Sequence, residues 1–440
     1  MKITRLKIKN LHGHINYNIN FNDNITFLYG DNGCGKTTIL NIMTNIITGK
    51  IYELFRYNFE EIVLCYISTK NNKREKITIT YDENENINLV FLGETVSMEI
   101  QNYKFMNRNV DEIENVERFY FSEYPVLKEI RDTFNYIYLP LNRNGTIMAD
   151  SYNMRYRKMT PSNYANSRNR FSNNIDSALL DVQALVSSAY SKENFTLKHI
   201  SEEFSDEILK SFLDVENITS MGQIIKYVKS LDAKSIRTIQ SDYVKVLKTI
   251  NKWNNNTEMK INSFFDSLIN DIDNSKNDSN GIAVELFFKL SELSKITNII
   301  VKAEATESSK KKAQQPIENF INTVNGFISS NSNEKMIYIE DDGTLYLKTE
   351  YNKRINIQNM SSGEKQIVTF FAYLIFGLET TNQSIFIVDE PELSLHLNWQ
   401  RKFIDAIMSI NQNVQLIFAT HAPEIIGRHR DKAIKLIPRV

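Results

Sequence analysis

The chain has 440 residues, 42% of them hydrophobic, and a formal net charge of −1 at pH 7. This length supports two or three structural units, and a nearly neutral chain does not coat nucleic acid through its overall charge. Two cysteines exclude a disulfide scaffold, and no apolar run or signal peptide points to a membrane, so we expect a cytoplasmic protein.

The first part of the sequence predicts strands around one helix. Residues 2–29 alternate apolar and polar positions and end in a short apolar run, which predicts a buried strand. A glycine-rich turn follows, and apolar residues at helical spacing then predict a helix that ends at Gly49. Further strands, four of them forming a meander, are predicted over residues 62–67, 77–81, 87–92, 95–100 and 136–139.

Residues 30–37 read GDNGCGKT and fit the pattern GxxxxGK[ST] between a predicted strand and a predicted helix. Glycines let backbone N–H groups approach phosphates, and the helix N-terminus adds partial positive charge. Lys36 should reach the β- and γ-phosphates of ATP, and the Thr37 hydroxyl should bind Mg²⁺. The residues of this P-loop that we expect to contact ATP are Asn32, Gly33, Cys34, Gly35, Lys36, Thr37 and Thr38.

The middle of the sequence, residues 161–330, is predicted to be helical. Its clearest stripe runs over residues 282–300, with apolar side chains at spacings of three and four. Polar breaks over residues 274–280 and 304–312 predict short helices, which exclude the long arms of a chromosome condenser. Beyond this insertion, two strands within residues 335–349 predict a hairpin.

Residues 359–366 read NMSSGEKQ and open an apolar helix. Ser361, Ser362 and Gly363 place a hydroxyl and bare amides at a helix start, which is a phosphate-binding geometry. Ser361 with Glu364 three residues later is also a capping box, which gives the segment a structural interpretation. The two interpretations are compatible.

Two more predicted buried strands end in polar residues. Residues 385–388 are apolar and deliver Asp389 and Glu390 at a carboxyl end. Asp389 should hold Mg²⁺, and Glu390 should orient or deprotonate the attacking water. The strand over residues 414–419 leads to His421, which could bond the γ-phosphate and that water, although a structural role is the alternative.

The order of these motifs resembles the ABC-type ATPase heads of the SMC family. It more closely resembles the ATPase halves of overcoming-lysogenization-defect nucleases and the stand-alone ATPase subunits of anti-phage systems of the PARIS and Septu types. The resemblance covers residues 1–160 and 331–440. It implies an α/β fold, an ABC-type P-loop head with a mixed sheet flanked by helices and an antiparallel β subdomain, with residues 161–330 as a helical insertion.

In that family, two heads enclose two ATP molecules, and each nucleotide meets the serine and glycine of the partner's signature segment. The resemblance therefore implies that Ser361, Ser362 and Gly363 act in trans. It also implies a D-loop at residues 394–396, in which Ser394 and His396 cross the dimer interface.

The chain departs from the family pattern at several positions. His12 stands where a basic residue usually reaches phosphate, and Leu397 replaces a common proline. Neither Gln101 nor Gln183 fits the position of the Q-loop glutamine. Asn142-Arg143 lies where this branch often has a polar loop near the nucleotide.

The resemblance implies an ATPase that hydrolyses ATP to ADP and phosphate with Mg²⁺. We expect a sensor and scaffold subunit of an anti-phage defence complex, which holds and releases an effector, expected to be a nuclease. The effector is expected to be a separate protein because no nuclease domain follows His421. Expected partners are a second copy in a head-to-head dimer or higher homo-oligomer, the effector, and a phage protein or nucleic acid as trigger. The alternative is an SMC-like DNA-repair or DNA-structuring ATPase, whereas a membrane-transporter ATPase usually has a much shorter insertion.

Residues 151–175 carry five basic side chains, interleaved aromatic rings and no acid. This pattern suits nucleic acid or an acidic protein partner. A solvated loop that caps the head explains it equally well.

Overall fold

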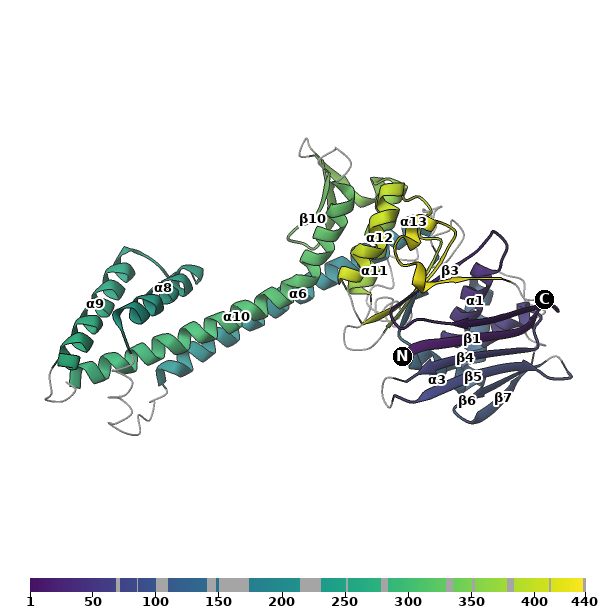
Figure 1. Ribbon diagram of the computed structural model, residues 1–440, viewed down its shortest axis with the longest axis horizontal. Helices are drawn as coiled ribbons and strands as arrows, with labels where there is room; N and C mark the ends of the chain where they lie inside the picture. The colour runs from purple at the N-terminus through teal and green to yellow at the C-terminus, as the bar shows by residue number, and fades with distance from the viewer. Residues whose placement is uncertain are drawn as a thin grey trace. The chain divides into compact units, whose positions relative to one another are not determined.

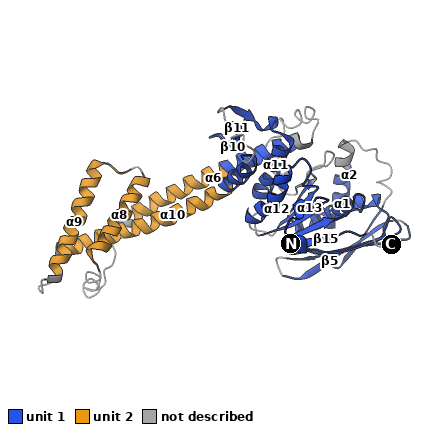
Figure 2. Cartoon of the chain, turned by 45° about the horizontal axis from the view of Figure 1, so that its top comes forward, with its two compact units in different colours: residues 1–190, 317–440 blue, residues 191–316 orange. Residues whose placement is uncertain are grey.

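The computed structural model describes two compact units, residues 1–190 with 317–440 and residues 191–316 (Figure 2). The description covers residues 1–440 except 69–71, 85, 100–109, 141–147, 150–173, 214–230, 251, 278–283, 330–334, 350–352, 378–383, 411–412 and 438–440. The division falls inside two long helices, whereas the sequence pattern changes at residues 161 and 330. The inner turns of these helices pack on the core of the first unit and therefore belong to it.

The centre of the first unit is a six-stranded mixed sheet (Figure 1). Its strands, in spatial order, are β15 (Ala433–Lys435), β3 (Ile25–Tyr29), β14 (Val414–Thr420), β13 (Ser384–Asp389), β8 (Tyr136–Pro140) and β9 (Met148–Ala149). The first five are parallel, and β9 is antiparallel to β8. Both β13 and β14 are buried along their whole length, and each has a central run of four apolar residues, 385–388 and 416–419.

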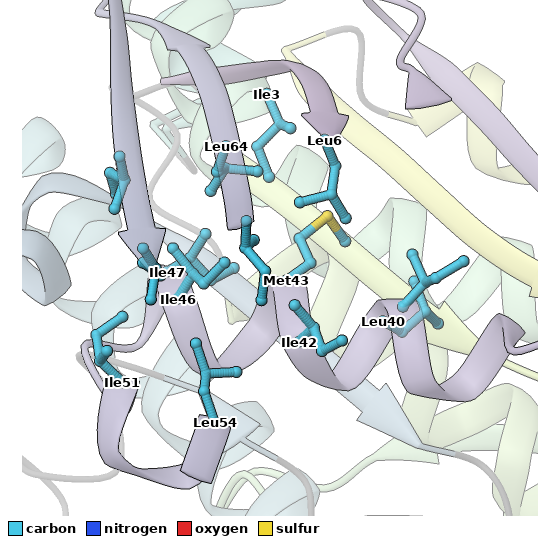
Figure 3. Packing of buried hydrophobic residues seen from close by; sticks show 14 of the residues in the cluster. Ile3, Leu6, Leu40, Ile42, Met43, Ile46, Ile47, Ile51, Leu54 and Leu64 are labelled. Atoms are coloured by element: carbon cyan, nitrogen blue, oxygen red, sulfur yellow. The ribbon is translucent and has the colours of Figure 1, made fainter. Parts of the chain in front are cut away.

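A second, antiparallel sheet forms the β subdomain. Its spatial order is β2 (Ile15–Asn20), β1 (Lys2–Leu11), β4 (Glu61–Ile67), β5 (Arg74–Tyr81), β6 (Ile87–Phe91) and β7 (Glu94–Met98). Helix α1 (Lys36–Ile47) buries its apolar residues against this sheet. Figure 3 shows Met43 and Ile46 of α1 packed with Leu6 and Leu64 of the sheet. The meander predicted from alternating residues is therefore confirmed.

Further elements cover the two sheets. They are η1 (Ile51–Arg56), α2 (Val110–Glu123), α3 (Pro125–Thr133), α11 (Ser362–Phe376), α12 (Leu397–Ile410), α13 (Pro423–Ile426) and η3 (Arg430–Lys432). A three-stranded antiparallel sheet of β10 (Met336–Ile339), β11 (Leu345–Lys348) and β12 (Arg354–Asn356), followed by η2 (Ile357–Asn359), precedes α11. The expected hairpin of residues 335–349 and the α/β fold class are confirmed.

Helices make up the described part of the second unit. They are the outer parts of α6 (Asn174–Leu213) and α10 (Val284–Ile328), together with α8 (Ala233–Thr249) and α9 (Asn255–Asn277). Phe265, Leu268 and Leu293 are fully buried in a core that belongs to this unit. The prediction of short helices is wrong, because α10 continues through residues 304–312. Five residues of that stretch are Glu or Lys, which are strong helix formers, so its polarity indicates a solvated helix.

None of the described helices is long and apolar enough to cross a membrane.

Candidate nucleotide-binding site

Three parallel strands bring the predicted motifs to one edge of the central sheet. Strand β14 lies between β3 and β13, with Thr420 opposite Tyr29 and Ala419 opposite Asp389. The P-loop follows β3, Glu390 follows β13, and His421 follows β14. Since all three strands point the same way, these residues gather at their common carboxyl edge, where open α/β sheets bind ligands.

The P-loop is shaped by glycines and supported by a tyrosine. Gly33 and Gly35 have φ values of 81° and 86°, which glycine adopts without steric cost. The Tyr17 hydroxyl donates to the backbone oxygen of Cys34 at 2.9 Å, and a Cβ on Gly35 would lie 2.6 Å from that hydroxyl. Tyr17 thus supports the loop from β2, a role that no local sequence pattern indicated.

Lys36 starts helix α1 and folds back across the loop. Its Nζ donates to the backbone oxygens of Gly30 at 2.9 Å and Asp31 at 3.1 Å, and the residue is 7% exposed. The ammonium group therefore lies over the turn that would enclose phosphate. Among the described residues, no carboxylate forms an ion pair with Lys36, so its charge remains available for an anion.

Asp389 is a buried acidic residue at the end of β13. It is fully buried, and neither of its oxygens has a hydrogen-bond partner among the described residues. The pKa of Asp389 is raised from 3.8 to about 6, chiefly by burial, which outweighs the lowering effect of the Thr37 hydroxyl, and Glu390 and Glu392 act in the same direction as burial. Thr37 is thus close enough to act on the charge without forming a hydrogen bond of good geometry.

Mg²⁺ fits this arrangement. Hard oxygen ligands suit Mg²⁺, which usually takes one or two protein oxygens together with phosphate and water. Thr37 and Asp389 supply such oxygens. Clusters of three or more His, Cys, Asp or Glu side chains that could hold a metal are absent from the described residues, so the nucleotide would have to complete the coordination.

Glu390 lies at a constrained turn. Its φ of 52° is left-handed, a conformation that costs a non-glycine residue roughly 1 kcal/mol or more. Its backbone N–H donates to the Ala419 oxygen at 2.8 Å, which ties the end of β13 to β14. The chain therefore turns directly after Asp389, and Glu390 is the first residue of this turn at the sheet edge.

His421 is held by an acid that the sequence pattern did not single out. One oxygen of Glu392, Oε1, lies 2.7 Å from the backbone nitrogen of His421 and 2.8 Å from its Nδ1. The Glu392 side chain is 4% exposed, whereas the His421 side chain is 46% exposed. The imidazole is thus anchored through Nδ1, while about half of the side chain stays exposed.

The structure confirms the capping box at the signature segment, residues 361–363. Ser361 is the N-cap of α11: its hydroxyl accepts from the Glu364 N–H, and the Glu364 carboxylate accepts from the Ser361 N–H at 2.8 Å. Lys335 pairs with the same carboxylate at 3.1 Å. Ser361 and Ser362 are exposed, so capping leaves both residues accessible to a nucleotide. Their contact with nucleotide stays a prediction.

The D-loop, residues 394–396, packs on the signature segment of the same chain. A Cβ on Gly363 would lie 2.6 Å from the Ser394 oxygen, and the Gln366 side chain donates to the Pro391 oxygen at 2.9 Å. Ser394 and His396 are exposed. The two segments therefore form one surface, and their contact with a partner stays a prediction.

The remaining predicted positions are Gln183, His12 and residues outside the described part of the chain. Gln183 belongs to α6 and bonds Gly343 and Leu345 of the β10–β11 hairpin, which is a structural role. His12 is exposed in the turn after β1. Gln101, Asn142-Arg143 and most of the basic segment 151–175 lie outside the described residues.

Comparisons with known proteins place these features in a family. The family model described as AAA ATPase domain matches residues 1–426. The chain is 21% identical to the Retron Vc95 probable ATPase of Vibrio cholerae serotype O1 biovar El Tor, over 94% of this chain and 69% of that protein. It is 29% identical over 83 residues to the Retron Ec83 probable ATPase of Escherichia coli, which is 17% of this chain and 15% of that protein.

Solved structures with a related arrangement are SMC head domains. The head from Pyrococcus furiosus, with an extended coiled coil, has a TM-score of 0.41 and 12% identity and covers 97% of this chain and 91% of its own. The head from Thermotoga maritima has a TM-score of 0.40 and 12% identity and covers 100% of this chain and 98% of its own.

Proposed function

The chain belongs to the AAA ATPase domain family, and from this we propose that it binds and hydrolyses ATP in sites shared between two copies of itself. The observation that carries the proposal is the meeting of three motifs at one sheet edge. The P-loop, the Asp389-Glu390 pair and His421 follow three adjacent parallel strands. A chance match to one motif would not bring the other two to the same edge.

Each residue has a role that its surroundings support. Lys36 would bind the β- and γ-phosphates, and Thr37 and Asp389 would hold Mg²⁺. The metal ion would neutralise charge that develops on the phosphates. Glu390 would orient the attacking water and accept its proton, while His421 would bond the γ-phosphate through Nε2, the ring nitrogen that Glu392 does not hold.

The second copy would complete each site. The exposed hydroxyls of Ser361 and Ser362 stand at the start of a helix whose partial positive charge suits phosphate. Ser394 and His396 are exposed beside them. In a symmetric dimer, one such surface would face the P-loop of the partner, so both sites would form together.

For the cellular role, we infer a sensor and scaffold subunit of an anti-phage defence complex that holds a separate effector, a nuclease, until a trigger arrives. Its support is the similarity to two proteins named as retron probable ATPases and the motif order of defence ATPases. The second candidate is a DNA-repair or DNA-structuring ATPase, which the basic segment 151–175 favours.

The two roles are separated by two measurements. Co-expression with the product of the neighbouring gene should yield a stable complex if the chain holds an effector, and a gene without such a neighbour would contradict that role. The DNA-acting role requires that DNA stimulates ATP turnover and that charge reversal of Arg155, Arg157 and Lys158 removes the stimulation. For hydrolysis itself, the purified chain should release phosphate from ATP with a specific activity that rises with protein concentration, because two copies form each site.

A further inference from the structure

The geometry points to Glu392 as a positioning residue for His421, an inference that rests on the proposed ATPase function. The family resemblance assigns roles to Asp389 and Glu390 but none to Glu392. We assign to Glu392 the task of fixing the tautomer and direction of the His421 ring, so that one ring nitrogen always faces the nucleotide.

The first support is the double contact made by one carboxylate oxygen. Glu392 Oε1 accepts from the backbone N–H of His421 at 2.7 Å and lies 2.8 Å from Nδ1 of the same residue. A carboxylate only accepts hydrogen bonds, so Nδ1 carries a proton. Nε2 is then the ring nitrogen left for another partner, and the side chain as a whole is 46% exposed.

The second support is the rigidity of Glu392 itself. Its backbone oxygen accepts from the Leu395 N–H at 3.1 Å and from the Gln400 side chain at 3.4 Å. The preceding residue, Pro391, is bonded to Gln366 of α11. The carboxylate is therefore fixed to the turn that also carries Asp389 and Glu390, and His421 takes its position from that turn.

The third support is that one oxygen of the Glu392 carboxylate has no hydrogen-bond partner among the described residues. This oxygen, Oε2, is buried. A buried carboxylate without full pairing lowers stability, and an apolar residue would fill the same space at less cost. A group kept under such conditions is typical of sites where a third residue orients a working histidine.

The kinetic test compares Glu392→Ala and Glu392→Gln, each alone and combined with His421→Ala. Glu392→Ala should lower kcat about 10- to 100-fold with ATP affinity unchanged, because the orientation of His421 is lost while Lys36 and the P-loop stay intact. Glu392→Gln keeps an acceptor oxygen and should retain most of the rate. In the His421→Ala background, Glu392→Ala should cause no further loss.

Equal losses in both backgrounds, or a loss of ATP affinity that matches the loss of rate, would overturn the inference and assign Glu392 a general structural role. Circular dichroism shows whether Glu392→Ala is folded. If it is unfolded, Glu392→Gln carries the comparison: its small loss of rate should vanish in the His421→Ala background, and an equal loss in both backgrounds would overturn the inference.

A spectroscopic test is independent of hydrolysis. Histidine-selective ¹⁵N labelling gives six histidines to resolve, and His421→Ala assigns the relevant signal. In the nucleotide-free protein, His421 should show a proton on Nδ1, and Glu392→Ala should abolish this preference. If the wild-type protein has no ATPase activity, the proposed function is contradicted. An unchanged tautomer in Glu392→Ala would contradict only the role of Glu392.

Discussion

The backbone oxygen of Ser394 lies against Gly363, at the place where any other residue would carry its Cβ. A Cβ added there would be 2.6 Å from that oxygen, which is shorter than side chains tolerate. Because of this close approach, the D-loop and the signature segment pack directly against each other. A change at Gly363 should therefore alter both at once.

We predict that Gly363→Ala lowers the free energy of unfolding by about 1 to 3 kcal/mol, because the added methyl group displaces the Ser394 backbone. Chemical denaturation of the apo protein measures this value. Gly326→Ala is the control: Gly326 lies within helix α10, where a Cβ would meet no atom within 4 Å. That change should stabilise the protein by about 0.5 to 1 kcal/mol, and equal effects of the two substitutions would refute the close-packing argument.

Capping and nucleotide contact can be separated at Ser361. Ser361→Asp keeps a good N-cap, so stability should stay within about 0.5 kcal/mol of the wild type, whereas Ser361→Ala should lose about 1 kcal/mol. Both variants should lose ATP turnover if the hydroxyl meets phosphate, and the aspartate should lose more through charge repulsion. Thermal unfolding and phosphate release measure the two effects, and full activity in Ser361→Asp would leave the capping role alone.

Substitutions of Lys36 and Glu390 should have different effects on ATP binding. Lys36→Ala should abolish ATP binding, because the buried ammonium group over the P-loop is removed. Glu390→Gln should retain binding, lower hydrolysis by about 10² to 10⁴-fold and accumulate an ATP-bound assembly. Equilibrium binding of labelled ATP and size-exclusion chromatography distinguish them. Normal turnover in Glu390→Gln would show that another group handles the water.

Asp389 should make the apo protein less stable at neutral pH. Its folded pKa of about 6 exceeds its ordinary value of 3.8. Folding therefore favours the protonated form, and stability is fully present below pH 4 and decreases as the pH rises through 6. Asp389→Asn should remove this pH dependence and stabilise the apo protein at pH 7 by about 1 to 2 kcal/mol, while losing Mg²⁺-dependent stabilisation by ATP. Denaturation curves between pH 4 and 7 measure it, and an unchanged pH dependence in the variant would contradict this account.

The sequence predicted those parts of the site that are contiguous. The P-loop, the end of β13 and the N-terminus of α11 each form from neighbouring residues, and their chemistry is readable in short patterns. Buried parallel strands are also visible as apolar runs. For this reason the sequence was sufficient to assign these motifs to one nucleotide, and the structure added that their strands are adjacent.

Contacts between distant residues were not predictable in this way. Tyr17 reaches the P-loop from β2, and Glu392 reaches His421 from 29 positions away, through tertiary packing that has no local signature. The long α10 helix was missed for a different reason. A polar stretch can be a loop or a solvated helix, and only its composition of helix formers separates the two.

The central claim, that two copies share each ATP site, is tested most directly by complementation. Lys36→Ala removes the P-loop charge, and Ser362→Arg blocks an exposed position at the start of α11 without removing the Ser361 cap. Each variant alone should be inactive. When the two are co-expressed under different tags, mixed dimers contain one intact shared site and should restore about a quarter of the wild-type rate. A mixture as inactive as its separate components would contradict the shared site.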